Sequence, residues 1–107
     1  MRDESKATNE ELFRNVNEQI EVLSQTVEPD DPLMEYLCEC DRPDCHEKLQ
    51  ATRGEYEAVR AEPTHFIVCV GHEDPQLERV FSSNDRFLIV EKQGSAARDA
   101  EETNPRN

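Results

Sequence analysis

Three cysteines, Cys38, Cys40 and Cys45, lie within eight positions of this 107-residue chain, in a stretch rich in Asp and Glu. Residues two apart point to the same side of an extended segment, so Cys38 and Cys40 can converge. The intervening residues 41–44 have the composition of a turn that would bring Cys45 back toward them. A structural zinc site takes four sulfur or imidazole ligands in a tetrahedron. The spacing therefore predicts three ligands of a zinc site and requires a fourth.

The candidates for the fourth ligand are His46, His65, Cys69 and His72. His46 directly follows Cys45, and two adjacent residues would be strained if both bound one ion. His72 follows Gly71 at the end of an apolar segment, where a glycine lets the backbone turn and present the next side chain. Cys69 lies inside that segment and is the alternative ligand. We therefore expect Zn²⁺ to be held by Cys38, Cys40, Cys45 and His72.

A site with four protein ligands leaves no open position for a water molecule, which favours a structural role over catalysis. The sequence contains no nucleophile elbow, no Gly-rich phosphate loop and no metalloprotease or deaminase motif. We therefore expect a protein that is not an enzyme, with a small hydrolase as a minor alternative. No apolar run is long enough for a signal peptide or a membrane span, which predicts a cytoplasmic protein whose thiols stay reduced.

The chain carries 25 acidic and 12 basic residues, a formal net charge of −13. Such a charge excludes nucleic-acid phosphate as the natural partner, because affinity for phosphate comes from Lys and Arg. The length fits one domain. Every Leu, Ile, Val and Phe lies between Leu12 and Val90, which predicts flexible tails at 1–8 and 94–107. The remaining core is small, and small domains often need a metal or another cross-link.

Residues 9–28 have the pattern of an amphipathic helix that begins with a capping box at Thr8–Glu11. Its apolar residues fall within an arc of about 100° and follow a heptad rhythm, while its acidic residues fall on the opposite side. Such a helix either docks on its own sheet through this stripe or pairs with a partner. The predicted partner-binding residues are Phe13, Val16, Ile20, Leu23 and Val27.

Residues 33–93 are predicted to form a small zinc-binding α+β domain. A second capping box, Thr52–Glu55, indicates one short helix, and residues 83–85 indicate the turn of a β-hairpin. The expected fold is therefore an N-terminal amphipathic helix plus a small antiparallel sheet of four to five strands with one crossing helix, stapled by zinc. The predicted strands are Leu33–Cys40, Lys48–Ala51, His65–Val70, Leu77–Ser82 and Arg86–Lys92.

This pattern resembles a family of short acidic actinobacterial proteins of unassigned function. The resemblance covers residues 12–92 and rests on the three cysteines, on 55–60, on 66–68, on Gly71-His72-Glu73 and on 90–92. It implies the Cys-x-Cys-x4-Cys and Gly-His ligand pattern without a thiol at Cys69, and it implies no activity.

The function predicted from these patterns is a non-catalytic zinc-binding module for protein interaction or regulation. It would act through the acidic amphipathic helix and an acidic surface, with steering by long-range charge. Its expected partner is a protein with a basic patch or a second copy of the chain, and neither nucleic acid nor a membrane. The alternative is a thiol-based redox switch that releases zinc when the cysteines are oxidised.

Overall fold

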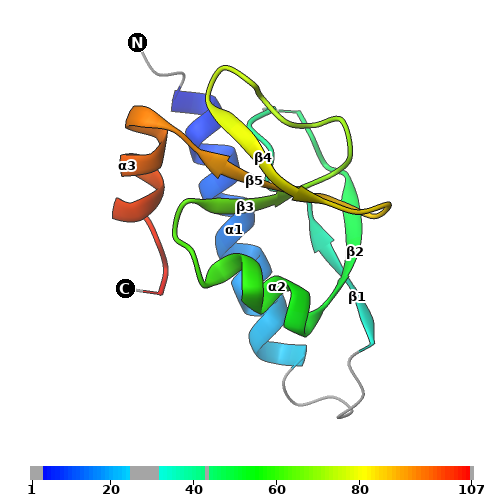
Figure 1. The fold of residues 1–107 in the computed structure, drawn as a ribbon. Helices are drawn as coiled ribbons and strands as arrows, with labels where there is room; N and C mark the ends of the chain where they lie inside the picture. Colours follow the sequence, from blue (N-terminus) through cyan, green and yellow to red (C-terminus); the bar gives the residue numbers. More distant parts are fainter. Residues whose placement is uncertain (1–3, 25–31, 43, 107) are drawn as a thin grey trace.

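A computed structural model describes residues 4–24, 32–42 and 44–106, with residues 4–9 and 24 described by their backbone only. These residues form three helices and five strands, an α+β arrangement that confirms the predicted class (Figure 1). In chain order the elements are α1 Glu4–Ser24, β1 Leu33–Leu37, β2 Lys48–Thr52, α2 Arg53–Arg60, β3 His65–Val68, β4 Glu78–Ser83, β5 Leu88–Lys92 and α3 Gly94–Glu102. None of the helices described is both long and apolar enough to serve as a membrane span.

The described strands form two antiparallel sheets, so the prediction of a single sheet of four to five strands is wrong. One sheet pairs β1 with β2, and the other has the order β3-β5-β4. Strand β1 ends at Leu37, and the chain beyond it reaches the edge of β3 through the hydrogen bond that the Glu39 amide donates to the Ile67 carbonyl at 2.8 Å. The sheets stay separate because the residues after Leu37 turn to form the cysteine loop.

The sequence predicts a capping box at the start of α2 and a turn between β4 and β5, and both are present. Thr52 caps α2: its side chain accepts from the Glu55 amide at 3.1 Å, and the Glu55 carboxylate accepts from the Thr52 amide at 2.8 Å. The turn between β4 and β5 is closed by Asn84, whose side chain accepts from the amides of Arg86 and Phe87. Local sequence therefore determines these two boundaries.

The core lies on both faces of the three-stranded sheet. One cluster joins the cysteine loop to the sheet and to α3, and it contains Cys38, Cys40, Cys45, Phe66, Val68, Leu88, Val90 and Ala100. The other joins α2 to the two-stranded sheet and contains Tyr36, Leu49, Ala51, Tyr56, Val59, Ile67 and Phe87. The alternating residues of β3 and β5 therefore divide the sheet between a cysteine side and an α2 side.

Helix α1 begins at Glu4, four residues before the predicted cap at Thr8, so the prediction of a flexible tail over 1–8 fails at residues 4–8. Glu4, Lys6 and Ala7 are good helix formers, which lets the helix run past Thr8. The helix is described as far as Ser24, and the predicted residues beyond it, including Val27, lie outside the described residues.

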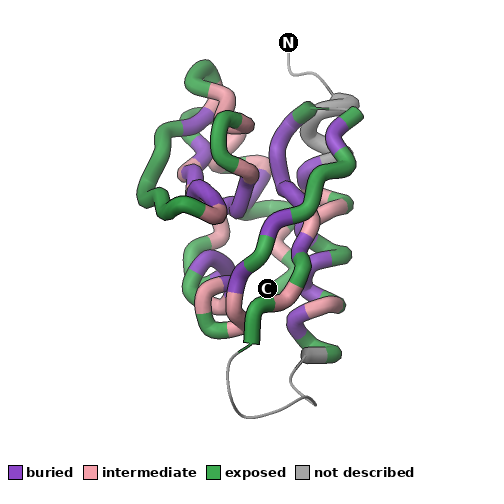
Figure 2. The backbone as a smooth tube through the Cα atoms, turned by 90° about the vertical axis from the view of Figure 1, so that its right-hand side faces the viewer, coloured by how far each residue is buried: buried purple, intermediate pink, exposed green. Residues whose placement is uncertain are grey.

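The buried face of α1 is polar, contrary to the expectation that its acidic residues face water. Glu10, Arg14, Asn17, Glu18 and Glu21 are buried, and they lie on the side of the helix opposite the apolar stripe. Figure 2 shows α1 at one side of the molecule, with its buried residues turned inward and its exposed residues along the outer edge. The apolar stripe is therefore only partly covered.

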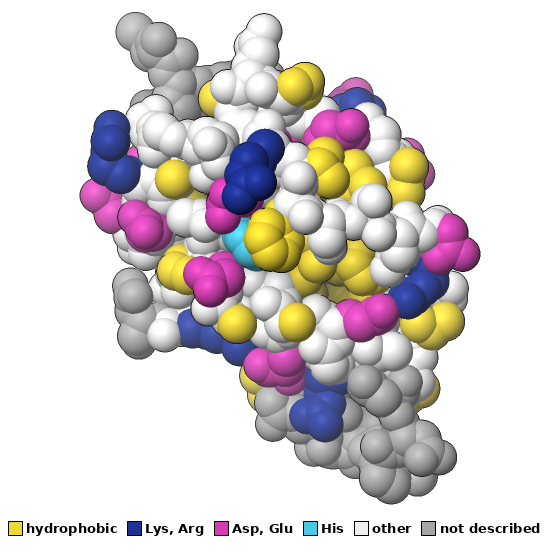
Figure 3. Space-filling model, viewed as in Figure 1, with side chains coloured by type: hydrophobic (Ala, Val, Ile, Leu, Met, Phe, Trp, Pro, Cys, Tyr) yellow, Lys and Arg dark blue, Asp and Glu magenta, His cyan; other side chains and the backbone are white. Residues whose placement is uncertain are grey.

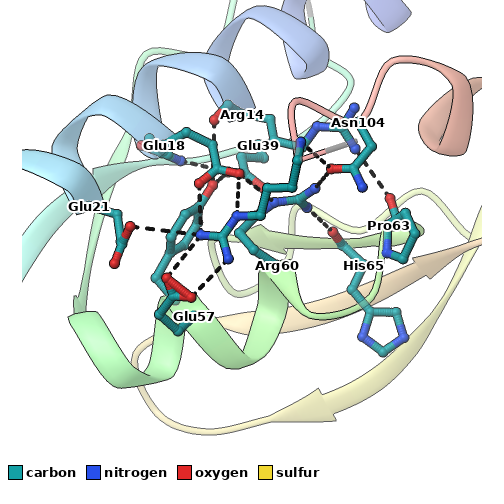
Figure 4. Close-up of polar contacts among 12 residues, drawn as sticks. Arg14, Glu18, Glu21, Glu39, Glu57, Arg60, Pro63, His65 and Asn104 are labelled. Carbon is teal, nitrogen blue, oxygen red and sulfur yellow. Dashed lines mark hydrogen bonds and ion pairs between the residues drawn. The ribbon is translucent and has the colours of Figure 1, made fainter.

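The buried polar face is stable because its groups find partners. The Arg14 guanidinium donates to the carbonyls of Pro63 and Ala100 and to the Thr103 hydroxyl, at 3.2, 3.3 and 2.8 Å. Glu18 accepts from Arg60 at 3.4 Å and from Arg106 at 2.7 Å. Figure 4 shows this network between α1, α2 and the C-terminal segment. Each paired group avoids the cost of an unsatisfied buried polar atom.

The segment 94–106 forms part of the fold, so the prediction of a flexible tail over 94–107 is wrong for these residues. Helix α3 packs Ala100 into the cysteine-side cluster. Beyond α3, Arg106 forms paired contacts with the carboxylates of both Glu18 and Glu57, at 2.7 to 3.1 Å. The segment is thus held by an alanine and by charged side chains. The prediction counted only Leu, Ile, Val and Phe and therefore missed these contacts.

One buried ion group connects α1 to the sheet. The Lys92 ammonium lies 2.6 Å from Glu10 and 2.5 Å from Glu78, and it stands 5.2 Å from the centroid of the Phe66 ring. Burial raises the pKa of Glu10 to about 7, in spite of the opposing effect of Lys92. Burial alone would lower the pKa of Lys92, but Glu10 and Glu78 raise it overall. The Glu10 carboxylate is therefore partly protonated near neutral pH.

The raised pKa of Glu10 predicts a specific pH dependence of stability. Between about pH 4.5 and 7 the folded chain keeps a proton that the unfolded chain releases. The raised pKa of Glu10 contributes up to about 3 kcal/mol to the free energy of unfolding. This contribution is greatest below pH 4.5 and is lost as the pH rises through 7. We expect Glu10→Gln to lack this component when urea unfolding is compared with wild type at each pH from about 5 to 7.5. Identical pH profiles for the two proteins would contradict it.

Candidate metal centre

The structure brings together the four side chains that the sequence singles out as ligands. Cys38, Cys40 and Cys45 are buried, His72 is partly buried, and their ligand atoms all lie within 4.8 Å of one another. This group could hold a metal ion. In the described part of the chain, Cys69 lies outside the group.

The elements around the group explain its geometry. The Cys38 amide donates to the Glu47 carbonyl at 2.9 Å, which continues the pairing of β1 with β2 by one residue. The Cys45 amide donates to the Arg42 carbonyl at 3.2 Å and closes the turn that returns Cys45 toward Cys38. The turn was expected from the spacing. The predicted strand to Cys40 ends at Leu37 instead, so Cys38 and Cys40 approach each other within the loop and not as alternate residues of a strand.

His72 reaches the cysteines from the end of β3. Gly71 has a φ of +88°, in the left-handed region that favours glycine, and the His72 amide donates to the Cys69 carbonyl at 3.0 Å. Arg42 ties the two loops together because its guanidinium donates to the Gly71 carbonyl at 3.0 Å. The turn at Gly71 therefore directs the imidazole at the cysteine loop.

The distances fit a tetrahedral zinc site. His72 Nδ1 lies 3.6 Å from Cys38 Sγ and 3.6 Å from Cys45 Sγ. Zn–S bonds of about 2.3 Å and Zn–N bonds of about 2.0 Å at a tetrahedral angle place sulfur and nitrogen about 3.5 Å apart. The donor set, three thiols and one imidazole, is also one that zinc prefers to Mg²⁺ or Ca²⁺.

The thiols are held in an environment that disfavours negative charge unless a cation is present. The contact with Cys38 and then burial raise the pKa of Cys40, and burial raises the pKa of Cys45. Without metal these two thiols are therefore protonated at neutral pH. A divalent cation would compensate the charge of the thiolates, so binding and proton release are coupled.

Two groups outside the ligand set support it. The Cys69 amide donates to Cys38 Sγ at 3.1 Å, a contact that would stabilise a thiolate. His72 Nε2 lies 3.6 Å from the Glu47 carboxylate, so an Nε2–H proton directed at Glu47 would leave the Nδ1 lone pair for the metal. Cys69, the alternative ligand in the sequence, contributes its backbone here.

Glu39, which sequence reasoning overlooked, holds the loop between two of the ligands. Its side chain is fully buried and accepts from Asn17 Nδ2 at 2.8 Å, from the Tyr56 hydroxyl at 2.6 Å and from the Ile67 amide at 3.1 Å. Burial raises the pKa of Glu39 in spite of these donors. The only signal in the sequence is its position between Cys38 and Cys40, which by itself does not distinguish a buried acid from an exposed one.

The other two histidines and the fourth cysteine contact residues outside the group of candidate ligands. His46 is exposed and contacts the Phe13 ring edge-on at 6.5 Å between centroids. His65 is buried, bonds to Glu91 at 3.2 Å and packs against Phe81. Cys69 Sγ contacts the Lys48 carbonyl at 3.8 Å. His46, His65 and Cys69 thus lie outside the group of four candidate ligands.

Comparison of the chain with protein-family models, with curated proteins and with solved structures gave no match. The chemistry of the site therefore rests on the residues and their geometry.

The contact between His72 and Glu47 predicts that Glu47→Gln weakens Zn²⁺ binding by about tenfold, because the imidazole loses the negative charge that orients its Nε2–H and raises its basicity. Competition with a chromophoric chelator at neutral pH measures the affinity. The matched control is Glu35→Gln, an equivalent change at an exposed acid of β1, which should leave the affinity unchanged. Equal affinities for both variants would show that Glu47 does not orient His72.

Proposed function

We propose that this chain is a non-catalytic zinc protein in which Zn²⁺, held by Cys38, Cys40, Cys45 and His72, fastens the cysteine loop to the end of β3. The buried cluster of three thiols and one imidazole carries this proposal. Four protein ligands leave no position for substrate or water, so the chemistry of the ion at this site is structural. The metal would stabilise a fold whose apolar core is small.

The zinc-stabilised domain then presents a surface for protein contact. The interaction role is supported by the apolar side chains that α1 exposes to water. Burial of these side chains against a partner would be favourable. Glu10, Glu18 and Glu21 of α1 are buried, so this role does not use these acids as the exposed helix face that the sequence pattern suggested.

The metal proposal predicts one zinc per chain in protein purified without a histidine tag. Cys40→Ser and His72→Ala should lose the metal, while Cys69→Ala, which alters a thiol outside the ligand group, should keep it. Removal of zinc by a chelator should lower the melting temperature by at least about 10 °C, which corresponds to about 2 kcal/mol for a domain of this size. Elemental analysis and thermal unfolding measure both. A metal-free protein that is stably folded would contradict the proposal.

A second candidate is a redox switch, which the position of Cys69 favours. Cys69 is the partly exposed thiol among the four, and its backbone contacts Cys38. In this switch two thiolates each give one electron to hydrogen peroxide and join in a disulfide. The peroxide takes up these electrons and two protons to become two waters, and Zn²⁺ leaves.

The switch predicts that mild peroxide releases zinc and lowers helix content, and that a reducing thiol with added Zn²⁺ restores both. Release should be several-fold slower in Cys69→Ala, since the most accessible thiol is missing. Zinc release followed with a colorimetric indicator and far-UV circular dichroism measure the two changes. Retention of zinc and helix after peroxide would exclude the switch while leaving the structural zinc site intact.

A further inference from the structure

The outer face of α1 has a composition unlike the rest of the chain. From residue 10 to residue 23, where side chains are described, the exposed positions of α1 are all uncharged: Leu12, Asn15, Val16, Gln19, Val22 and Leu23. They fall within an arc of about 120° at 100° per residue. Over the whole chain 35% of residues are charged, so an uncharged helix face of this size is distinctive.

The buried charged side chains of α1 form contacts inside the molecule. Glu10 and Glu18 pair with Lys92, Arg60 and Arg106, and Arg14 bonds to backbone carbonyls. The opposite side of the molecule carries exposed Asp, Glu, Lys and Arg side chains among its hydrophobic ones (Figure 3). Between residues 10 and 23, α1 thus buries four of its charged side chains and leaves apolar ones, Leu12 at 51% and Val16 at 37% exposure among them, in water.

The spacing of this face suits a second helix. Leu12, Val16, Gln19 and Leu23 are separated by four, three and four residues, the rhythm with which two helices pack side by side. A sheet surface does not require this rhythm, and the sheet of this chain is already covered on that side by the polar face of α1. Gln19 and Asn15 supply uncharged side chains that can hydrogen-bond across such a seam.

We propose that two copies of this chain associate through the exposed face of α1, an inference that rests on the interaction role proposed above and names its partner. Two chains of charge −13 repel each other, so self-association requires a surface that brings no like charges into contact. The α1 face meets this condition because none of its six exposed residues is charged. It is also apolar enough to gain free energy from burial.

A basic partner fits this face less well than a second copy. Recognition of a basic surface needs exposed carboxylates at the contact, and the buried Glu10, Glu18 and Glu21 cannot provide them. The two partners differ in their response to salt. Added salt screens the repulsion between two acidic copies and should tighten the dimer, whereas it weakens the attraction between an acidic chain and a basic one.

The size of the face limits the area that a dimer can bury. The segment from Leu12 to Leu23 is about 17 Å long, so two copies joined through it bury at most about the 1,200 Å² at which the range for specific interfaces begins. We therefore expect a reversible dimer with a dissociation constant in the micromolar range.

Sedimentation equilibrium of the zinc-loaded protein tests this proposal, with chain concentrations from about 1 µM to about 500 µM. The monomer mass is 12.4 kDa, and the wild type should approach twice this mass at the upper end. Val16→Asp and Leu12→Asp should each raise the dissociation constant more than tenfold, because each places two like charges in an apolar seam. The matched control is Val80→Asp on β4, since Val80 is 43% exposed and lies on a different element, and it should dimerise like wild type.

Zinc content and far-UV circular dichroism are measured on every sample, so a failure of the metal site is seen separately from a failure of the dimer. A dimer that tightens between about 0.05 M and about 0.5 M salt and is lost in both α1 variants supports the proposal. A wild type that stays monomeric over the whole range overturns it, including the case in which another part of the chain covers α1. A dimer that persists in both α1 variants, or that only Val80→Asp removes, also overturns it.

Discussion

The structure depends on one buried carboxylate. Glu39 lies between two candidate metal ligands and receives hydrogen bonds from Asn17 of α1, from Tyr56 of α2 and from Ile67 of β3. A buried acid is costly unless its acceptors are satisfied, so the three elements must be in place for the cysteine loop to adopt its path. The same contacts fix the residue between Cys38 and Cys40. The metal centre and the packing of α1 and α2 therefore both depend on Glu39.

The inward polar face of α1 follows from the same requirement. In this chain with a small apolar core, Lys92, Arg60 and Arg106 pair with the acids of α1 and hold that face of the helix against the rest of the fold. The pairs link elements that are far apart in the sequence, so they specify the arrangement of the helices as well as stabilising it. Because the polar face of α1 turns inward to form these pairs, the apolar stripe of the helix stays at the surface. This stripe is the surface that a role beyond metal binding would use.

The parts of this structure that sequence could predict are those determined by neighbouring residues. The Thr52–Glu55 capping box, the starts of β1, β2 and β3, and the convergence of three cysteines with His72 all follow from local spacing. The buried face of α1 could not be predicted, because the hydrophobic pattern assumes that polar groups lack partners inside. Arg14 finds such partners in Pro63 and Ala100, residues about 50 and 90 positions away. Helix α3 was missed because it packs through alanine.

Asn17 also has a consequence for how the chain behaves among copies of itself. Its side-chain amide donates to the Leu37 carbonyl and accepts from the Leu37 amide, both at 2.8 Å. These are the two bonds that one residue of an adjoining strand would make at the free edge of β1. Exposed strand edges are the templates from which misassembled aggregates grow. Asn17 thus occupies the free edge of β1 at Leu37 and removes this residue as a pairing point for a strand of another copy.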